Sequence, residues 1–215
     1  MGRFGDWINR QRHNRGFGIQ SPSSFFFITQ VLNERLPYYA YPALEYIASQ
    51  EGYSAKRLKE LFRIANNHQP VNCIAVGSPA AACAMIAAKP TATAHCITET
   101  MPVKEVSEML KSTGCNVTTG NIMERLAVIL DAQKEIGMLY IGNTPHRAEL
   151  LETALRYTND NSLIVIDGIH NDSTTAAWWQ TVIEKPETII TYDLYSKGLL
   201  FFNKERIKQH YTLKR

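Results

Sequence analysis

From residue 71 onward, short apolar runs alternate with longer stretches in which apolar residues recur every three or four positions. The short runs predict buried strands, and the longer stretches predict amphipathic helices. We expect strands at 71–76, 94–98, 115–118, 137–141, 162–166, 187–192 and 198–202. We expect helices from the first strand to about 88 and over 102–112, 121–135, 147–157 and 173–184. Five such strand–helix units predict a parallel sheet with helices on both faces.

The first 66 residues have a different pattern, in which a polar, Gly-rich and basic entry over 1–20 precedes three predicted helices. Ser21 followed by Pro22 is typical of a helix start. Two further helices are predicted near 42–49 and 54–66, and in the second of these the apolar residues fall at helical spacing. The chain therefore begins with a helical layer of about 65 residues that precedes the sheet.

The last two predicted strands have no helix between them. Residues 193–197 separate these strands and indicate a hairpin. A parallel sheet that ends in a hairpin must contain one antiparallel strand near its edge. The sequence thus predicts an α/β, doubly wound, seven-stranded sheet whose last strand is antiparallel.

Composition and charge narrow the function classes. The chain has 215 residues, 45% of them hydrophobic, and a net charge of +3. Its two ends are basic, since residues 1–15 sum to +3 and residues 204–215 to +4. Such ends contact nucleic acid in some proteins, but no recognised nucleic-acid module accompanies them here, so we disfavour that function and expect solvated termini.

Targeting and redox signals are absent from the sequence pattern. No apolar run approaches the ~18 residues of a membrane span, and the start has no secretory pattern. The four cysteines show no CxxC pair and no zinc spacing with histidine. We therefore expect buried free thiols, a cytoplasmic protein and no membrane partner.

Four segments, in order along the chain, resemble a known family. They are RGFGIQSP at 15–22, LFRIAN at 61–66, LIVIDGIH at 163–170 and KQHYTL at 208–213. With the strand order above, the chain resembles the class I S-adenosylmethionine-dependent methyltransferases, and within them a bacterial O-methyltransferase-like group of Bacteroidetes. The resemblance implies a Rossmann-like fold, with a basic segment and helical layer over 1–66 and a methyltransferase domain over 67–215 forming one compact unit.

The turn after the first strand is the expected cofactor site. In nucleotide-binding α/β folds a Gly-rich turn at a helix N-terminus holds the cofactor. The family motif would place an acid at Ala75, and Gly77 is the one glycine kept. Pro79 has no N–H to donate, and Ala81 adds a methyl group where close approach is expected. Gly77 and Ser78 remain as candidate cofactor contacts, and the alternative is a turn that binds nothing.

Two further cofactor contacts are implied by the resemblance. Glu99 directly follows the second strand, where an acid accepts the hydroxyls of an adenosine ribose. Asn121 follows the third strand, beside the expected adenine position. Asn121 is equally suited to cap the next helix. The alternative for Glu99 is an ordinary surface carboxylate with no ligand.

The ends of the fourth and fifth strands bear on catalysis. Relatives that use a divalent metal have acids there, whereas this chain has Gly142-Asn143 and Asp167-Gly168. One remaining acid is too few for a hard cation, so we expect no metal site of that type. His170 would take a proton from a substrate hydroxyl, with Asp167 orienting it or touching the cofactor amine. The alternative is a turn cap at Asp167 and a surface histidine.

Two functions remain open. The first is S-adenosylmethionine-dependent O-methyl transfer to a small molecule, weakened or lost through the changes in the first motif. The second is a non-catalytic methyltransferase-fold protein that binds a ligand or a protein partner. Relatives of this fold are often dimers, so a homodimer is also left open. We expect Tyr38, Tyr39 and Tyr41 to pack in the core; the alternative is a place in the wall of the acceptor pocket, which the N-terminal helices shape in the family.

Overall fold

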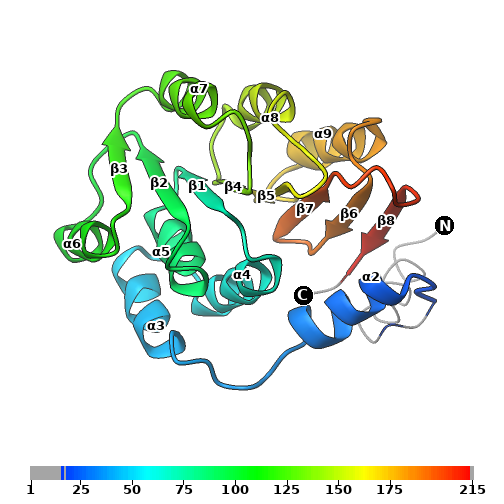
Figure 1. Ribbon diagram of the computed structural model, residues 1–215, viewed down its shortest axis with the longest axis horizontal. Helices are drawn as coiled ribbons and strands as arrows, with labels where there is room; N and C mark the ends of the chain where they lie inside the picture. The colour runs from blue at the N-terminus through cyan, green and yellow to red at the C-terminus, as the bar shows by residue number, and fades with distance from the viewer. Residues whose placement is uncertain (1–15, 17, 214–215) are drawn as a thin grey trace.

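The structure is a computed structural model that describes residue 16 and residues 18–213. Its centre is an eight-stranded sheet in the order β3-β2-β1-β4-β5-β7-β6-β8 (Figure 1). The strands are β1 Asn72–Val76, β2 Thr93–Thr98, β3 Asn116–Thr119, β4 Met138–Ile141, β5 Leu163–Asp167, β6 Ile190–Asp193, β7 Lys197–Phe201 and β8 Gln209–Thr212. The predicted doubly wound α/β class is confirmed, with one strand more than expected.

Helices cover both faces of the sheet. The first face carries α3 (Tyr41–Gln50), α4 (Ala55–His68), α5 (Pro79–Ala88) and α6 (Lys104–Ser112). The opposite face carries α7 (Ile122–Gln133), α8 (Arg147–Leu155) and α9 (Ser173–Glu184), as Figure 1 shows. Two hydrophobic cores result, one on each side of the sheet. Strand β1 contributes Cys73 and Ala75 to one core and Ile74 and Val76 to the other, as alternation along a strand requires.

Strand register brings three loop starts together. Val76 pairs with Ile97 of β2 on one side and with Ile141 of β4 on the other. These strands are parallel, so the residues that follow them leave the sheet at one edge. The chain passes from β1 outward to β2 and β3 and then returns to β4. Ligands of doubly wound folds bind in the crevice at this reversal.

The predicted hairpin is confirmed by the pairing of β6 with β7, and a further strand is added to it. Strand β7 is antiparallel to both β5 and β6, so it lies between them rather than at the edge. The edge is β8, which pairs in parallel with β6 and was not expected from its short polar sequence. The ring of Tyr211 on β8 stacks on Tyr192 of β6, with the centroids 5.2 Å apart.

The helical layer starts where the sequence predicts, but with an unexpected geometry. Helix α2 (Pro22–Phe26) begins at Ser21, whose Oγ accepts the Ser24 N–H. It continues directly into the π-helix η1 (Phe27–Leu32). Arg63 of α4 donates from Nε to the carbonyl of Val31 and from one terminal nitrogen to that of Leu32, both at 3.0 Å. This guanidinium satisfies carbonyls that end η1 and ties the segment to α4.

Helix α5 is buried on almost every side because it packs between the sheet and the helices α3 and α4. Eight of its ten residues are buried, and most of them are alanine. Such small side chains allow the three layers to approach closely. Ser78 caps the helix, because its Oγ accepts the Ala81 N–H at 3.2 Å. The apolar surround thus fixes the turn that precedes α5.

Candidate functional site

The turn between β1 and α5 is open toward solvent. Gly77 has φ +72°, a conformation that favours glycine. A Cβ built there would meet no atom within 4 Å. The Gly77 N–H donates to the carbonyl of Ile97 at 2.8 Å, which holds the turn against β2. Pro79 therefore does not collapse the turn.

A cleft of about 370 Å³ lies beside Gly77 at the carboxyl ends of the strands. This volume falls within the range of small-molecule sites. Its walls come from three parts of the fold: the α3–α4 connection, the β1 and β2 ends, and the loops that enter α7 and α8. The lining residues are Glu51, Gly77, Pro79, Thr98, Glu99, Thr100, Met101, Pro102, Val103, Ile122, Asn143, Thr144 and Pro145.

Two oxygens of residues that line the cleft are shielded from solvent and lack hydrogen-bond partners among the described residues. They are Oγ1 of Thr98 and Oε1 of Glu51. Buried polar atoms are almost always satisfied in folded proteins, and an exception calls for an explanation. A polar ligand that reached these oxygens through the cleft would supply the missing partners.

The structure brings only some of the predicted cofactor residues together. Gly77 and Glu99 line the same cleft, as the cofactor hypothesis requires. Ser78 and Asn121 are helix caps instead: the Asn121 Oδ1 accepts the N–H groups of Met123 at 3.0 Å and Glu124 at 3.3 Å. The expected obstruction by Ala81 was wrong, because this side chain is fully buried in the core and faces away from the cleft.

Asp167 belongs to a buried network on the α4 face of the sheet. Its Oδ2 accepts the Tyr53 hydroxyl at 3.2 Å, and the hydroxyls of Tyr53 and Tyr140 are 2.6 Å apart. Burial, together with the nearby Asp167, raises the pKa of both tyrosines. Asp167 is itself buried and is absent from the lining of the cleft.

Lys197 completes this network from β7. Its side chain is fully buried, and its Nζ donates to the carbonyl of Arg57 at 3.0 Å and lies 3.4 Å from Oε2 of Glu60. Burial lowers the pKa of Lys197, whereas Glu60 and Asp167 act in the opposite direction. The network thus joins β5, β7 and α4 electrostatically.

His170 has a different partner from the one expected. Its Nε2 lies 2.7 Å from Oδ2 of Asp193, at the end of β6, and its ring stacks on Tyr195 with the centroids 5.2 Å apart. The hypothesis that Asp167 orients His170 was wrong, because the Asp167 carboxylate turns to Tyr53. A buried carboxylate that holds one ring nitrogen leaves the other, Nδ1, as a proton acceptor.

Arg147 links the cleft to the loop that carries His170. Its guanidinium donates to Oδ1 of Asn143 at 2.6 Å, to the carbonyl of Thr144 at 3.0 Å and to the carbonyl of Gly168 at 3.1 Å. Asn143 and Thr144 line the cleft, and Gly168 precedes His170 by two residues. His170 itself lies outside the lining.

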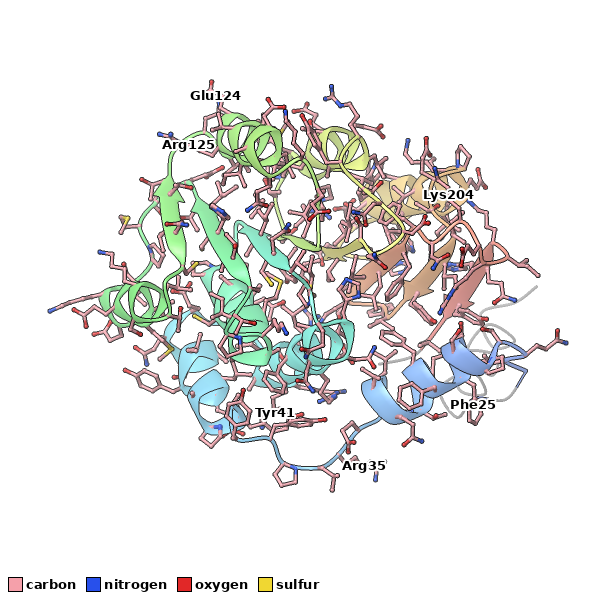
Figure 2. The ribbon with its side chains drawn as sticks, viewed as in Figure 1. Phe25, Arg35, Tyr41, Glu124, Arg125 and Lys204 are labelled. Atoms are coloured by element: carbon pink, nitrogen blue, oxygen red, sulfur yellow. The ribbon has the colours of Figure 1, made fainter. Side chains whose placement is uncertain are left out.

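Sequence reasoning missed Glu51, Asp193 and Arg147. None of them stands in a recognisable motif, and each reaches the site from a loop, a strand end or a helix start whose position depends on the fold. Tyr38, Tyr39 and Tyr41 do not line the cleft, and their rings lie around Phe62 of α4. Figure 2 shows Tyr41 at the margin of the molecule, beside the N-terminal helices.

A second hollow lies at the opposite, amino-terminal ends of the strands. It measures about 680 Å³ and is bordered by Phe26, His68, Gly137 and Tyr192, among others. The His68 side chain already has a hydrogen-bond partner there, because its Nε2 lies 3.0 Å from the carbonyl of Gly137. We favour the smaller cleft because it lies at the strand reversal and carries the unpartnered oxygens.

The described residues contain neither a membrane-spanning helix nor a cluster of metal-ligating side chains. Within residues 18–213, no helix has both the length and the apolar character to cross a membrane. In the same part of the chain, no three His, Cys, Asp or Glu side chains gather closely enough to hold a metal ion.

Comparison with known proteins identifies the fold. No family model and no curated protein matches the sequence. Among solved structures, the SAH-bound methyltransferase PaMTH1 of Podospora anserina matches with a TM-score of 0.62 at 13% identity, over 86% of this chain and 97% of that one. The Bacillus cereus O-methyltransferase in complex with SAH gives 0.60 at 12%, over 80% and 96%. The O-methyltransferase TomG of Streptomyces achromogenes, in complex with SAM, gives 0.58 at 14%, over 82% and 94%. The chain therefore has the Rossmann-like fold of the class I methyltransferases.

Proposed function

We propose that this chain binds S-adenosylmethionine in the cleft between Gly77 and Glu99 and descends from O-methyltransferases that act on small molecules, with methyl transfer weakened or lost. The observation that carries the proposal is the open turn at Gly77, with Glu99 in the wall of the same cleft. SAM and SAH complexes among the structural neighbours support it. The sequence segments quoted above support a place in the Bacteroidetes group.

The residues of the cleft suit an adenosyl ligand. The exposed Glu99 carboxylate offers two acceptor oxygens to vicinal ribose hydroxyls. Met101 and Ile122 supply apolar walls suited to a planar base. The absence of a side chain at Gly77 lets a ligand approach the backbone closely. Of the family's first motif only Gly77 remains, but the turn that contains it still leaves room for a ligand.

Methyl transfer would depend on residues outside the cleft wall. S-adenosylmethionine, when bound, supplies a methyl group on a positively charged sulfur. His170, held at Nε2 by Asp193, is the residue we assign to accept the proton of a hydroxyl acceptor at Nδ1. Arg147 would hold the His170 loop against the cleft through Asn143 and Gly168. We propose that no divalent metal takes part.

A non-catalytic, ligand-binding role is the second candidate. It is favoured by the placement of Asp167 and His170, which do not line the cleft, and by the use of Ser78 as a helix cap. In that case the cleft would bind the cofactor, or a related nucleoside, without turnover. Both candidate functions use the same cleft, and they differ in whether His170 takes part in methyl transfer.

Calorimetric titration with S-adenosylmethionine and S-adenosylhomocysteine tests the proposal. We predict micromolar binding to the wild-type chain and a loss of at least about tenfold in the Glu99→Ala variant, because a charge-assisted hydrogen-bond acceptor is removed. Glu105→Ala serves as a control, since Glu105 is an exposed acid of α6 outside the cleft lining. An absence of binding at millimolar ligand would overturn the proposal.

The same variants separate the two candidates when methyl transfer to hydroxyl compounds is assayed. A catalytic protein would lose turnover in His170→Ala while it retains cofactor affinity. Turnover that is unaffected by His170→Ala would remove this residue from the proposed role.

A further inference from the structure

Glu51 enters the cleft from an element outside the sheet. It directly follows α3, and its N–H donates to the carbonyl of Ile47 at 3.0 Å, which fixes the backbone at this point. Apart from Glu99, it is the one acidic residue that lines the cleft. The two acids come from different layers of the fold, one from a strand end and one from the helical layer.

The carboxyl group of Glu51 is under-satisfied. Its Oε1 is shielded from solvent and has no hydrogen-bond partner among the described residues. Burial raises the pKa of this carboxyl, and the Val103 N–H opposes the rise. A carboxylate oxygen without a partner is costly, and a cationic or hydrogen-bond-donating ligand that reaches Oε1 through the cleft would remove that cost.

The ends of β1, β4 and β5 place no acidic side chain in this cleft that could bind the amino group of a ligand. Position 75, at the end of β1, is Ala75, which is fully buried in the core. Gly142 follows β4, and a Cβ there would lie 2.8 Å from the carbonyl of Val76, so the packing admits no acidic side chain. Asp167, at the end of β5, accepts the Tyr53 hydroxyl at Oδ2; its Oδ1 also has no partner among the described residues, but Asp167 does not line the cleft. Glu51 is left as the acid that faces the cleft beside Gly77 and Pro79.

We propose that Glu51 is the residue that recognises the α-ammonium group of the adenosyl cofactor in this chain. The inference rests on the proposed function, because it concerns the amino-acid end of the same ligand. An ammonium carries three donors and a full positive charge, which match an under-satisfied carboxylate. Glu51 and Glu99 then divide the recognition: Glu99 binds the sugar and Glu51 the amino acid.

A pair of ligands tests this division. S-adenosylhomocysteine carries the ammonium, whereas 5′-methylthioadenosine has the same nucleoside and sulfur without an amino acid. Calorimetry of Glu51→Gln should show a loss of about 10- to 100-fold for S-adenosylhomocysteine, because a charge-assisted contact is removed. The affinity for 5′-methylthioadenosine should stay within about twofold. Glu105→Gln, on the exposed face of α6, should change neither affinity.

Thermal unfolding of the unliganded variants separates recognition from a structural role. The Oε1 of Glu51 has no partner to lose, so Glu51→Gln should unfold at or above the wild-type temperature. A destabilised variant with equal losses for both ligands would overturn the inference and make Glu51 a structural residue. Unchanged affinity for S-adenosylhomocysteine would overturn it while the proposed function stands. If the wild-type chain binds neither ligand, the proposed function fails and this inference fails with it.

Discussion

At the scale of the residue, two positions determine the conformation of the turn between β1 and α5. Gly77 adopts a left-handed conformation without any neighbour over it, and Ser78 uses its hydroxyl to start α5. Neither role depends on further glycines in this turn. Sequence reasoning treated Pro79 and Ala81 as obstacles, but Ala81 faces the core. The direction of a side chain at a turn is set by packing that the motif does not encode.

Gly77→Ala tests the openness of this turn. The variant should be destabilised by about 1 kcal/mol, because φ +72° is unfavourable for alanine, and should bind S-adenosylhomocysteine less tightly. Gly114 is a matched control: it has φ +75°, an equally open surround, and no place in the cleft. Gly114→Ala should cost similar stability in urea unfolding and leave binding unchanged. Equal binding by both variants would argue against a ligand over Gly77.

The buried cysteines predict a stability that falls at alkaline pH. Burial raises the pKa of Cys73 and Cys83 to about 12 and that of Cys115 to about 11, and it also raises that of Cys96. In the unfolded chain thiols ionise near pH 8.5, so their contribution is complete below that pH and declines as pH rises toward 12. Each thiol gives a slope of up to about 1.4 kcal/mol per pH unit.

Urea unfolding at pH 8 and pH 10 measures this slope. Lys197 acts in the opposite direction, since a lowered pKa favours the folded state as pH rises toward the unfolded value, but one lysine is outweighed by four thiols. Cys73→Ala should show a shallower decline than wild type. Equal stability at the two pH values would contradict the burial of these thiols.

At the scale of the element, most of the fold follows from periodicity. Strand β1 and the helix after it were predictable because the apolar run Cys73–Val76 is followed by a turn and a small-residue helix. Strand β8 was not, because Gln209–Thr212 gives no apolar alternation and is placed by pairing with β6. The carbonyls at the end of η1 are likewise bound by a residue of another helix, Arg63 of α4. The local sequence pattern does not predict an element whose position is set by contacts with residues distant in the sequence.

The buried ion pair between β7 and α4 makes a prediction at this scale. Lys197→Met should destabilise the protein by about 3–5 kcal/mol, because Glu60 and Asp167 would keep buried charge without their cation. Glu60→Gln in the same chain should recover part of that loss. Urea unfolding of the two variants and of wild type measures both effects. A single variant as stable as wild type would show that the pair does not stabilise the contact between these elements.

At the scale of the whole molecule, the cleft exists only because three layers meet. The β1–α5 turn, the β2 end and the α3–α4 connection contribute Gly77, Glu99 and Glu51 to one cavity. Gly77 and Glu99 were predictable from their positions after strands. Glu51 was not, since a residue between two helices has no fixed relation to a strand end until the layers pack. Asp193 reached His170 in the same way, through the pairing of β6 with β7.

A crystal structure determined with saturating S-adenosylhomocysteine tests the central claim most directly. We expect the ligand in the cleft beside Gly77, with its ribose hydroxyls on Glu99 and its ammonium on Glu51. Ligand found instead in the larger hollow beside His68 and Tyr192, or an empty cleft at millimolar ligand, would contradict the account.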